Sequence, residues 1–206
     1  MSEAFSRINW VDLFSLIIFI RISYVSSRAG VGKQVLPSIL LVAMLTVVLH
    51  SYMEIASLFI NNYSFNPSTC IFVSYFSIML VLWVVYKMVS RISGTILSVG
   101  ETSINGIEIA GGTFVGMFRS FIIVGILIIG LLLVPVKFVE DGVRRSYSGS
   151  FVIGTNLKIY TVMAKLIFRD QTVTEEGVKK QLFANKSKYF LDAINVRSKS
   201  RFFKEN

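Results

Sequence analysis

The most restrictive feature of the sequence is an apolar stretch that runs from Ile104 to Pro135. Its second half, Phe121 to Val134, contains no charged and no strongly polar side chain. Its first half places Gly112, Gly116 and Ser120 four residues apart, so that they share one face of a helix. Small residues at this spacing let two helix backbones approach closely in lipid. We therefore expect a membrane-spanning helix against which other helices pack through this face.

The composition places most of the chain in lipid. Apolar residues make up 53% of its 206 residues and the mean hydropathy is +0.66, both above what soluble domains of this size carry. Segments of about 20 apolar residues, the length needed to cross a bilayer, fall near 10–27, 35–53, 70–89 and 107–135. We therefore predict an all-α integral membrane protein with four transmembrane helices and short amphipathic interfacial helices. Residues 1–136 form the membrane domain on this interpretation.

The first helix begins beside an acidic residue whose role the sequence leaves open. The first ten residues carry one acid and one base rather than a net positive charge, so we expect no cleaved signal peptide. Asp12 could serve a charge relay or an ion site, or it could be an interfacial carboxylate that the helix dipole favours. We prefer the interfacial role, because functional carboxylates within membranes usually have partners and none is visible near Asp12 in the sequence.

The last predicted span carries a charge of each sign. Glu108 lies at its start, and Arg119 follows about three helical turns later. The guanidinium of Arg119 could reach back to Glu108 or to a lipid phosphate, or it could contact a transported substrate. We favour the anchoring role for Arg119.

Two segments outside the spans predict interfacial helices. Residues 93–106 are too polar to cross a bilayer and fit a short amphipathic helix, or else a re-entrant segment sheltered by protein. Residues 137–206 form a basic extramembrane tail with an amphipathic helix near 157–168. An apolar face with lysines opposite it suits a membrane surface. The apolar face consists of Ile159, Val162, Met163, Leu166 and Ile167, and the lysines on the opposite side are Lys158 and Lys165.

Residues for catalysis or metal binding are scarce. His50 is the only histidine and Cys70 the only cysteine, so a zinc site of Cys and His ligands cannot form. The sequence shows no set of nucleophile, base and orienting group that would make a catalytic site. We therefore expect no catalytic residue, no cofactor, no metal and no enzymatic activity. The tail holds 14 of the 21 basic residues but also seven of the 12 acids, and this mixture argues against a nucleic-acid partner.

Three short motifs follow one another in a recognisable order. The first span opens with Trp10-Val-Asp12, and the turn Arg28-Ala29-Gly30 comes after it. The last span opens with Gly106, Glu108, Gly112, Gly116 and Arg119 in one register. Over about residues 9–168 this order resembles the colicin V production protein (CvpA) family of bacterial inner membranes. The chain departs from the family pattern at Ala29, Lys33, Ile109 and Ser120. The resemblance implies that the candidate functional residues are Asp12, Arg28, Gly106, Glu108 and Arg119.

The resemblance implies a multi-pass inner-membrane protein linked to toxin production and export and to envelope homeostasis. It implies a non-enzymatic scaffold or accessory factor, whose partners would be the lipid bilayer, other membrane or export proteins and a second copy of the chain. The alternative is a subunit of an oligomeric transporter or channel, although four spans are few and no inverted repeat is visible. Basic residues flank the two sides almost equally, five against four, so only the resemblance favours periplasmic termini.

Overall fold

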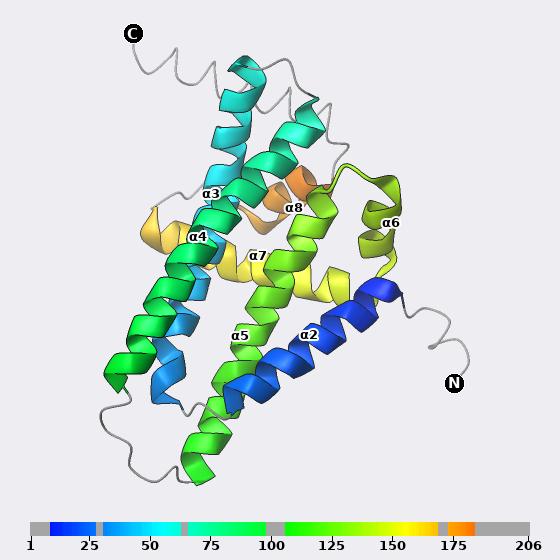
Figure 1. Cartoon of the computed structure of the whole chain (residues 1–206). Helices are drawn as coiled ribbons and strands as arrows, with labels where there is room; N and C mark the ends of the chain where they lie inside the picture. Colours follow the sequence, from blue (N-terminus) through cyan, green and yellow to red (C-terminus); the bar gives the residue numbers. More distant parts are fainter. Residues whose placement is uncertain (1–8, 28–30, 63–65, 98–105, 169–172, 184–206) are drawn as a thin grey trace, which may run out of the picture.

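The computed structural model describes residues 9–27, 31–62, 66–97, 106–168 and 173–183 (Figure 1). All regular secondary structure in these ranges is α-helical, as predicted. Helix α2 begins and ends where the first span was expected, whereas the second and third helices extend well beyond their apolar segments. The helices are α2 (Trp10–Ser27), α3 (Gly32–Asn62), α4 (Pro67–Leu97), α5 (Gly106–Leu133), α6 (Lys137–Arg145), α7 (Tyr147–Ile167) and α8 (Glu175–Phe183).

Three helices, not the four predicted, are candidate membrane spans among the described residues. They are Gly32–Ile60, Pro67–Ile92 and Ala110–Leu133, within α3, α4 and α5. The expected first span, α2, is only 18 residues long and includes both Asp12 and Arg21. The helix expected within 93–106 is partly the end of α4, which continues to Leu97; residues 98–105 lie outside the described ranges.

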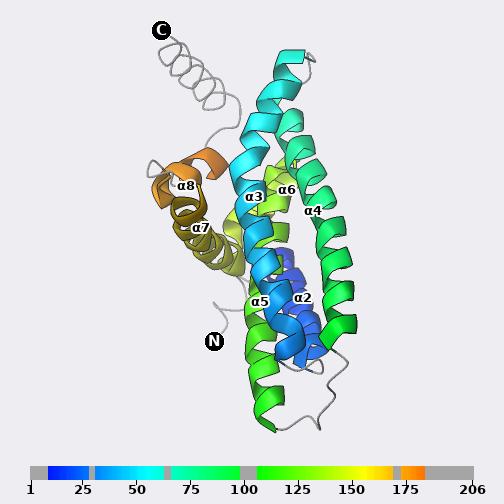
Figure 2. The ribbon, with the colours of Figure 1, turned by 90° about the vertical axis from the view of Figure 1, so that its left-hand side faces the viewer.

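The long helices form a bundle that α7 crosses on one side. Helices α3, α4 and α5 extend along the length of the molecule, and α2 lies obliquely against α5 (Figure 1). In the perpendicular view α7 and α8 lie together beside α3 and α5, away from α4 (Figure 2). The short helix α6 leads from the end of α5 back to the start of α7, so that the α6–α7 junction meets the N-terminal end of α2.

The core of the bundle is apolar and includes the helices after residue 136. Leu41 and Leu45 of α3 and a run of isoleucine and leucine on α5 are fully buried. Leu157 of α7 and Leu182 of α8 join the same cluster. Lipid is as apolar as these side chains, so within the spans van der Waals contact, and not exclusion of water, stabilises their packing. With Val143 of α6, the tail therefore contributes three described helices to the packing of the bundle.

Helix α7 packs on the bundle through one face and leaves much of the apolar face predicted for a membrane surface exposed. The helix begins at Tyr147, about ten residues before the predicted start, and Val162, Leu166 and Ile167 are exposed. Ile159 and Met163 pack against the core. The buried stripe recurs every three to four residues, as one face of a helix requires, and it comprises Gly149, Val152, Ile153, Asn156, Leu157, Tyr160 and Ala164.

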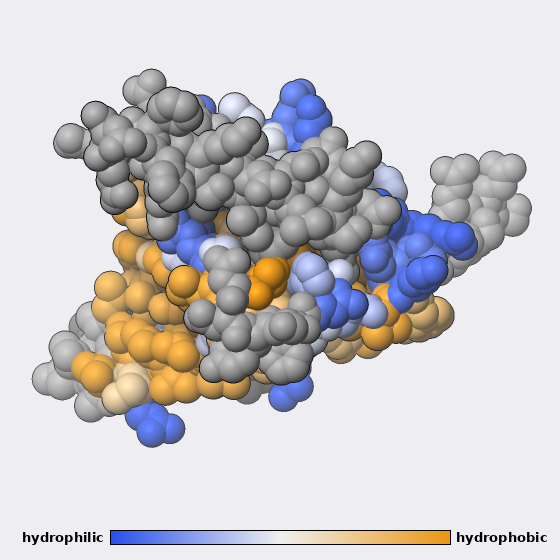
Figure 3. Space-filling view, turned by 90° about the horizontal axis from the view of Figure 1, so that it is seen from above, coloured by the Kyte–Doolittle hydropathy of each residue, from blue (hydrophilic) through white to orange (hydrophobic). Residues whose placement is uncertain are grey.

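The outer surface of the bundle is strongly apolar. Only 22% of the span on α4 is buried, against 56% for the spans on α3 and α5. Seen from above, apolar side chains cover one flank of the molecule and hydrophilic ones gather towards the other side (Figure 3). A continuous apolar surface of this kind is typical of helices that face lipid. On α4 it comprises Val73, Phe76, Leu80, Val81, Val84, Val85, Met88 and Ile92.

Candidate functional site

The predicted small-residue face of α5 packs against the C-terminal half of α2. A methyl group at Gly116 would collide with the Cβ atom of Ser26, so only glycine permits this approach. One turn later the hydroxyls of Ser120 and Ser23 lie 3.0 Å apart. Because Ser120 donates its proton to the Gly116 carbonyl at 2.7 Å, Ser23 is the donor in that pair. We call these four residues the α2–α5 seam; Gly112, the third predicted member of the face, is buried one turn before it.

Helix α3 closes the seam from a third direction through Gln34. Its side chain is 1% exposed, and its Nε2 donates to the carbonyl of Ser26. The Oε1 atom of Gln34 is buried and has no hydrogen-bond partner among the described residues. This oxygen would lie 3.6 Å from a Cβ atom at Gly116, so α2, α3 and α5 meet at this glycine.

Asp12 joins the start of α2 to the start of α7. Its Oδ1 accepts hydrogen bonds from the hydroxyl of Ser146 and from the backbone N–H of Ser148, both at 2.7 Å. Its Oδ2 accepts from the backbone N–H of Asn9 at 3.0 Å. Asn9 in turn donates from Nδ2 to the carbonyl of Gly142 in α6 at 2.7 Å. A single carboxylate thus caps its own helix and the first turn of another helix, and we call this arrangement the Asp12 clasp.

The clasp favours the ionised form of Asp12. Partial burial alone would raise the pKa of the carboxyl, but hydrogen bonds from Ser148, Asn9 and Ser146 lower it to about 2. The N-terminal amide groups of α7 also carry partial positive charge, which an anion at this position neutralises. The carboxylate is therefore charged at neutral pH and acts as a structural acceptor.

Aromatic packing covers the clasp on the α6 side. The rings of Trp10 and Phe138 stack with centroids 6.1 Å apart. A Cβ atom on Gly142 would lie 2.7 Å from Nε1 of Trp10, so a larger residue there would displace the indole ring. The N-terminal end of α2 is thus held by both polar and aromatic contacts.

A buried asparagine joins α7 to the middle of α5. Asn156 is fully buried and occupies the space next to the Cα atom of Gly125, where a methyl group would collide with its amide. Its Nδ2 donates to the carbonyls of Val152 and Phe121, at 2.9 and 3.4 Å. Its Oδ1 has no partner in the described residues. Neither Asn156 nor Gly125 was singled out by the sequence, although a lone asparagine within an apolar helix face is a signal that could have been used.

Arg119 contacts an aromatic ring rather than the acid expected. Its guanidinium carbon lies 5.4 Å from the ring centroid of Tyr86 on α4. Glu108 is exposed and, within the described residues, no ion pair joins it to Arg119. Gly106 is the first residue of α5, and Arg28 lies outside the described ranges. The candidate residues are therefore distributed over the bundle and do not converge on one site.

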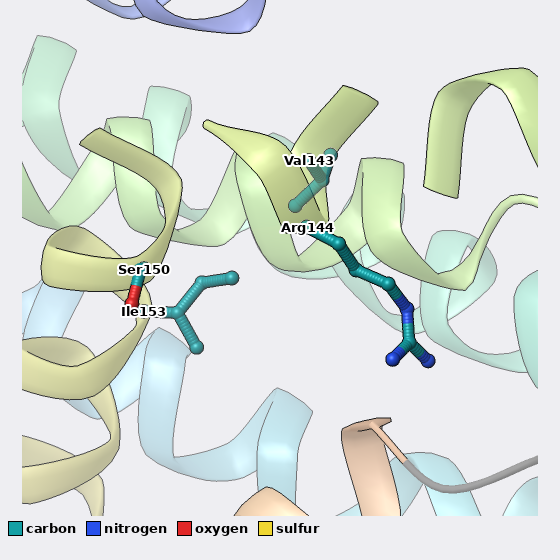
Figure 4. A pocket seen from close by; sticks show the side chains of 4 residues that line it. All are labelled: Val143, Arg144, Ser150 and Ile153. Carbon is teal, nitrogen blue, oxygen red and sulfur yellow. The ribbon is translucent and has the colours of Figure 1, made fainter. Parts of the chain in front are cut away.

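A small surface pocket lies at the α6–α7 corner. It measures about 200 Å³, with Val143 and Arg144 on α6 facing Ser150 and Ile153 on α7 (Figure 4). Arg144 is paired with Glu140 at 2.8 Å. In the described part of the chain no three His, Cys, Asp or Glu side chains come close enough to hold a metal ion.

Comparison with models of protein families assigns this chain to a family. The family model described as colicin V production protein matches residues 11–156, which is more than two thirds of the chain. The chain belongs to the colicin V production protein family. No curated protein and no solved structure matches the chain. The matched range includes Asp12, Ser146, Ser148, the α2–α5 seam and Asn156. The resemblance predicted from the sequence is thus confirmed.

Proposed function

We propose that this family member is a non-enzymatic scaffold or accessory factor of the bacterial inner membrane that supports colicin V production and export and envelope homeostasis. Family membership supports this assignment, and so does the closed packing of the bundle. The observation that carries the proposal is the way α2 is fixed at both ends, by the Asp12 clasp and by the α2–α5 seam. This arrangement stabilises a rigid assembly of helices and presents no arrangement for a chemical reaction.

Helix α2 acts as the fourth membrane-spanning element on this proposal. Its 18 residues extend about 27 Å along the helix axis, close to the thickness of the hydrocarbon core. Apart from Arg21, its outward side chains are apolar, and Asp12 is positioned at one interface. The exposed apolar residues are Leu13, Phe14, Leu16, Ile17, Ile20, Tyr24 and Val25.

Periplasmic termini and a partner surface on the exposed face of α4 complete the proposal. The partners are the lipid bilayer, other membrane or export proteins and a second copy of the chain. A reporter fused to the C-terminus that is active only in the cytoplasm would give no signal if the termini are periplasmic. Strong signal from such a fusion would reverse the orientation.

The second candidate function is that of a transporter or channel subunit. It is favoured by two buried polar atoms that have no partner in the described residues of the spans, Oε1 of Gln34 and Nε of Arg119. Polar groups buried within membrane helices often mark the path of a solute.

One experiment separates the two functions in a strain that lacks its own family member and produces colicin V. Gly116→Val disrupts the α2–α5 seam, Arg119→Gln leaves the seam intact, and Gly154→Val is a control because no neighbour lies within 4 Å of the Cβ position at Gly154. Membrane levels are matched by immunoblotting, and toxin release and recovery of crosslinked partners are measured. If the protein is a scaffold, Gly116→Val loses toxin release and crosslinked partners, whereas Arg119→Gln retains toxin release and crosslinked partners. Loss of release with Arg119→Gln alone, at unchanged level and crosslinking, refutes the scaffold and supports the transporter.

A further inference from the structure

Two cations lie over two neighbouring aromatic rings between α4 and α5. The Nζ of Lys87 is 5.7 Å from the ring centroid of Trp83, and the guanidinium carbon of Arg119 is 5.4 Å from that of Tyr86. The two rings are themselves 5.3 Å apart with an interplanar angle of 32°. A cation over an aromatic face is attracted by the ring quadrupole, but its charge is not neutralised. This cluster therefore brings two positive charges together.

Neither cation has an acidic partner in the described residues. No carboxylate in those ranges lies within ion-pair distance of Lys87 or Arg119. The Nε of Arg119 is buried and lacks an acceptor there as well. A guanidinium has five N–H donors in a planar fork, which matches the oxygen atoms of a carboxylate or phosphate group. The cluster is thus deficient in negative charge and in hydrogen-bond acceptors.

The cluster lies within the two spans, in the half of the bundle that belongs to one leaflet. Lys87 precedes the end of the α4 span at Ile92 by five residues, about 8 Å along the helix. Arg119 follows the start of the α5 span at Ala110 by nine residues, about 14 Å. The ends of both spans lie on the same side of the bundle, because α4 and α5 are antiparallel (Figure 1). From within a span, long basic side chains extend towards the phosphate region of the nearer leaflet, and local thinning of the bilayer brings the phosphate groups closer.

We propose that this cluster binds the phosphate group of an anionic phospholipid. The guanidinium of Arg119 and the ammonium of Lys87 hold the phosphate oxygens, while the rings of Trp83 and Tyr86 orient the cations. Basic clusters between membrane helices commonly bind anionic headgroups. The surrounding surface selects a lipid rather than a soluble anion, since Val84 and Met88 on α4 are 50% and 61% exposed and offer an apolar surface for acyl chains.

The test uses Trp83 as the reporter of lipid occupancy. The chain has two tryptophans, so a Trp10→Phe background leaves Trp83 as the only one. The full chain is reconstituted in vesicles of phosphatidylcholine and phosphatidylglycerol in which either lipid carries brominated acyl chains that quench tryptophan fluorescence. The ratio of Trp83 quenching by brominated phosphatidylglycerol to quenching by brominated phosphatidylcholine gives the preference of the cluster for the anionic lipid. Two basic side chains near an anionic lipid correspond to an enrichment on the order of 30-fold.

We expect preferential quenching by brominated phosphatidylglycerol, and its loss in the double variant Lys87→Gln, Arg119→Gln. Lys158→Gln, Lys165→Gln is the matched control, because it removes two exposed cations from α7 and should retain the preference. Lys87→Arg should also retain it, which shows that charge and not a loss of folding is measured. Equal quenching by the two lipids in the parent protein would overturn the proposal. Displacement of the brominated lipid by millimolar inorganic phosphate would also overturn it, in favour of a soluble anion.

Discussion

Replacement of Gly116 by alanine tests whether the α2–α5 seam depends on a close backbone approach. In a helix interior alanine is favoured over glycine by about 1 kcal/mol. Here the added methyl group would collide with the Cβ atom of Ser26, which is attached directly to the backbone and cannot rotate away. Overpacking costs typically about 1–3 kcal/mol, and a rigid neighbour places this site towards the upper limit. We therefore expect a net loss of about 1–2 kcal/mol in the free energy of unfolding.

The assay is unfolding in mixed micelles with a rising fraction of sodium dodecyl sulfate, followed by circular dichroism. Ser26→Gly removes the colliding Cβ atom, so Gly116→Ala in that background should recover the propensity gain of about 1 kcal/mol. The double-mutant cycle should therefore give a coupling energy of about 2–3 kcal/mol between Gly116 and Ser26. Gly154→Ala is the control, because its Cβ position is open and alanine there should stabilise the protein.

Two results would refute this reasoning. The first is a Gly116→Ala variant that is as stable as Gly154→Ala, which would mean that the two backbones are not in close contact. The second is a destabilised Gly116→Ala that Ser26→Gly does not rescue, which would locate the collision elsewhere.

Three further predictions concern the other contacts between helices. The pKa of Asp12 is about 2 in the folded protein, below the ordinary value of 3.8, so its contribution is complete above pH 4 and is lost as the pH falls towards 2. After discounting for solvent screening, the ionised carboxylate contributes about 1 kcal/mol to the free energy of unfolding. Asp12→Asn should abolish this part of the pH dependence when stability is titrated with acid. An unchanged pH profile in Asp12→Asn would exclude the clasp. Gly125→Ala should lower stability by about 1–2 kcal/mol because it collides with the amide of Asn156, and Asn156→Ala should relieve this loss in the same micelle assay. Tyr75→Phe removes the 2.8 Å hydrogen bond from its hydroxyl to the carbonyl of Ile126 and should cost about 1 kcal/mol, and an unchanged unfolding midpoint would contradict that bond.

The sequence predicted the elements whose determinants are local. The apolar segments and their polar flanks predicted four helices in the first 135 residues, and the bounds of α2 agreed with the structure. The spacing of Gly116 and Ser120 predicted a close helix contact, and the structure shows Ser26 and Ser23 opposite them. The fourth span was the exception, since only three helices are candidate spans among the described residues. The remaining helix, α2, has only 18 residues and carries both Asp12 and Arg21.

The contacts that the sequence did not predict join residues far apart in the chain. Two partners of Asp12, Ser146 and Ser148, are more than 130 residues away, so inspection of its neighbours in the sequence could not reveal them. Arg119 was expected to anchor at Glu108 or at a lipid phosphate, and the contact of its guanidinium with the ring of Tyr86 on α4 was not foreseen. Helix α7 has apolar residues on more than one face, and which face is buried depends on the shape of the surface that α3 and α5 present. These outcomes depend on tertiary packing, which local periodicity does not determine.

The Asp12 clasp also bears on the order in which the protein is assembled during synthesis. Helix α2 leaves the ribosome long before Ser146 and Ser148. The carboxylate of Asp12 therefore has only the backbone N–H of Asn9 as a partner until about two thirds of the chain has been made. Until then the helix would be tethered to the growing bundle mainly by its C-terminal half. Nascent chains stopped before residue 146 should therefore leave the N-terminal end of the first helix open to proteases, and chains stopped after residue 168 should protect it.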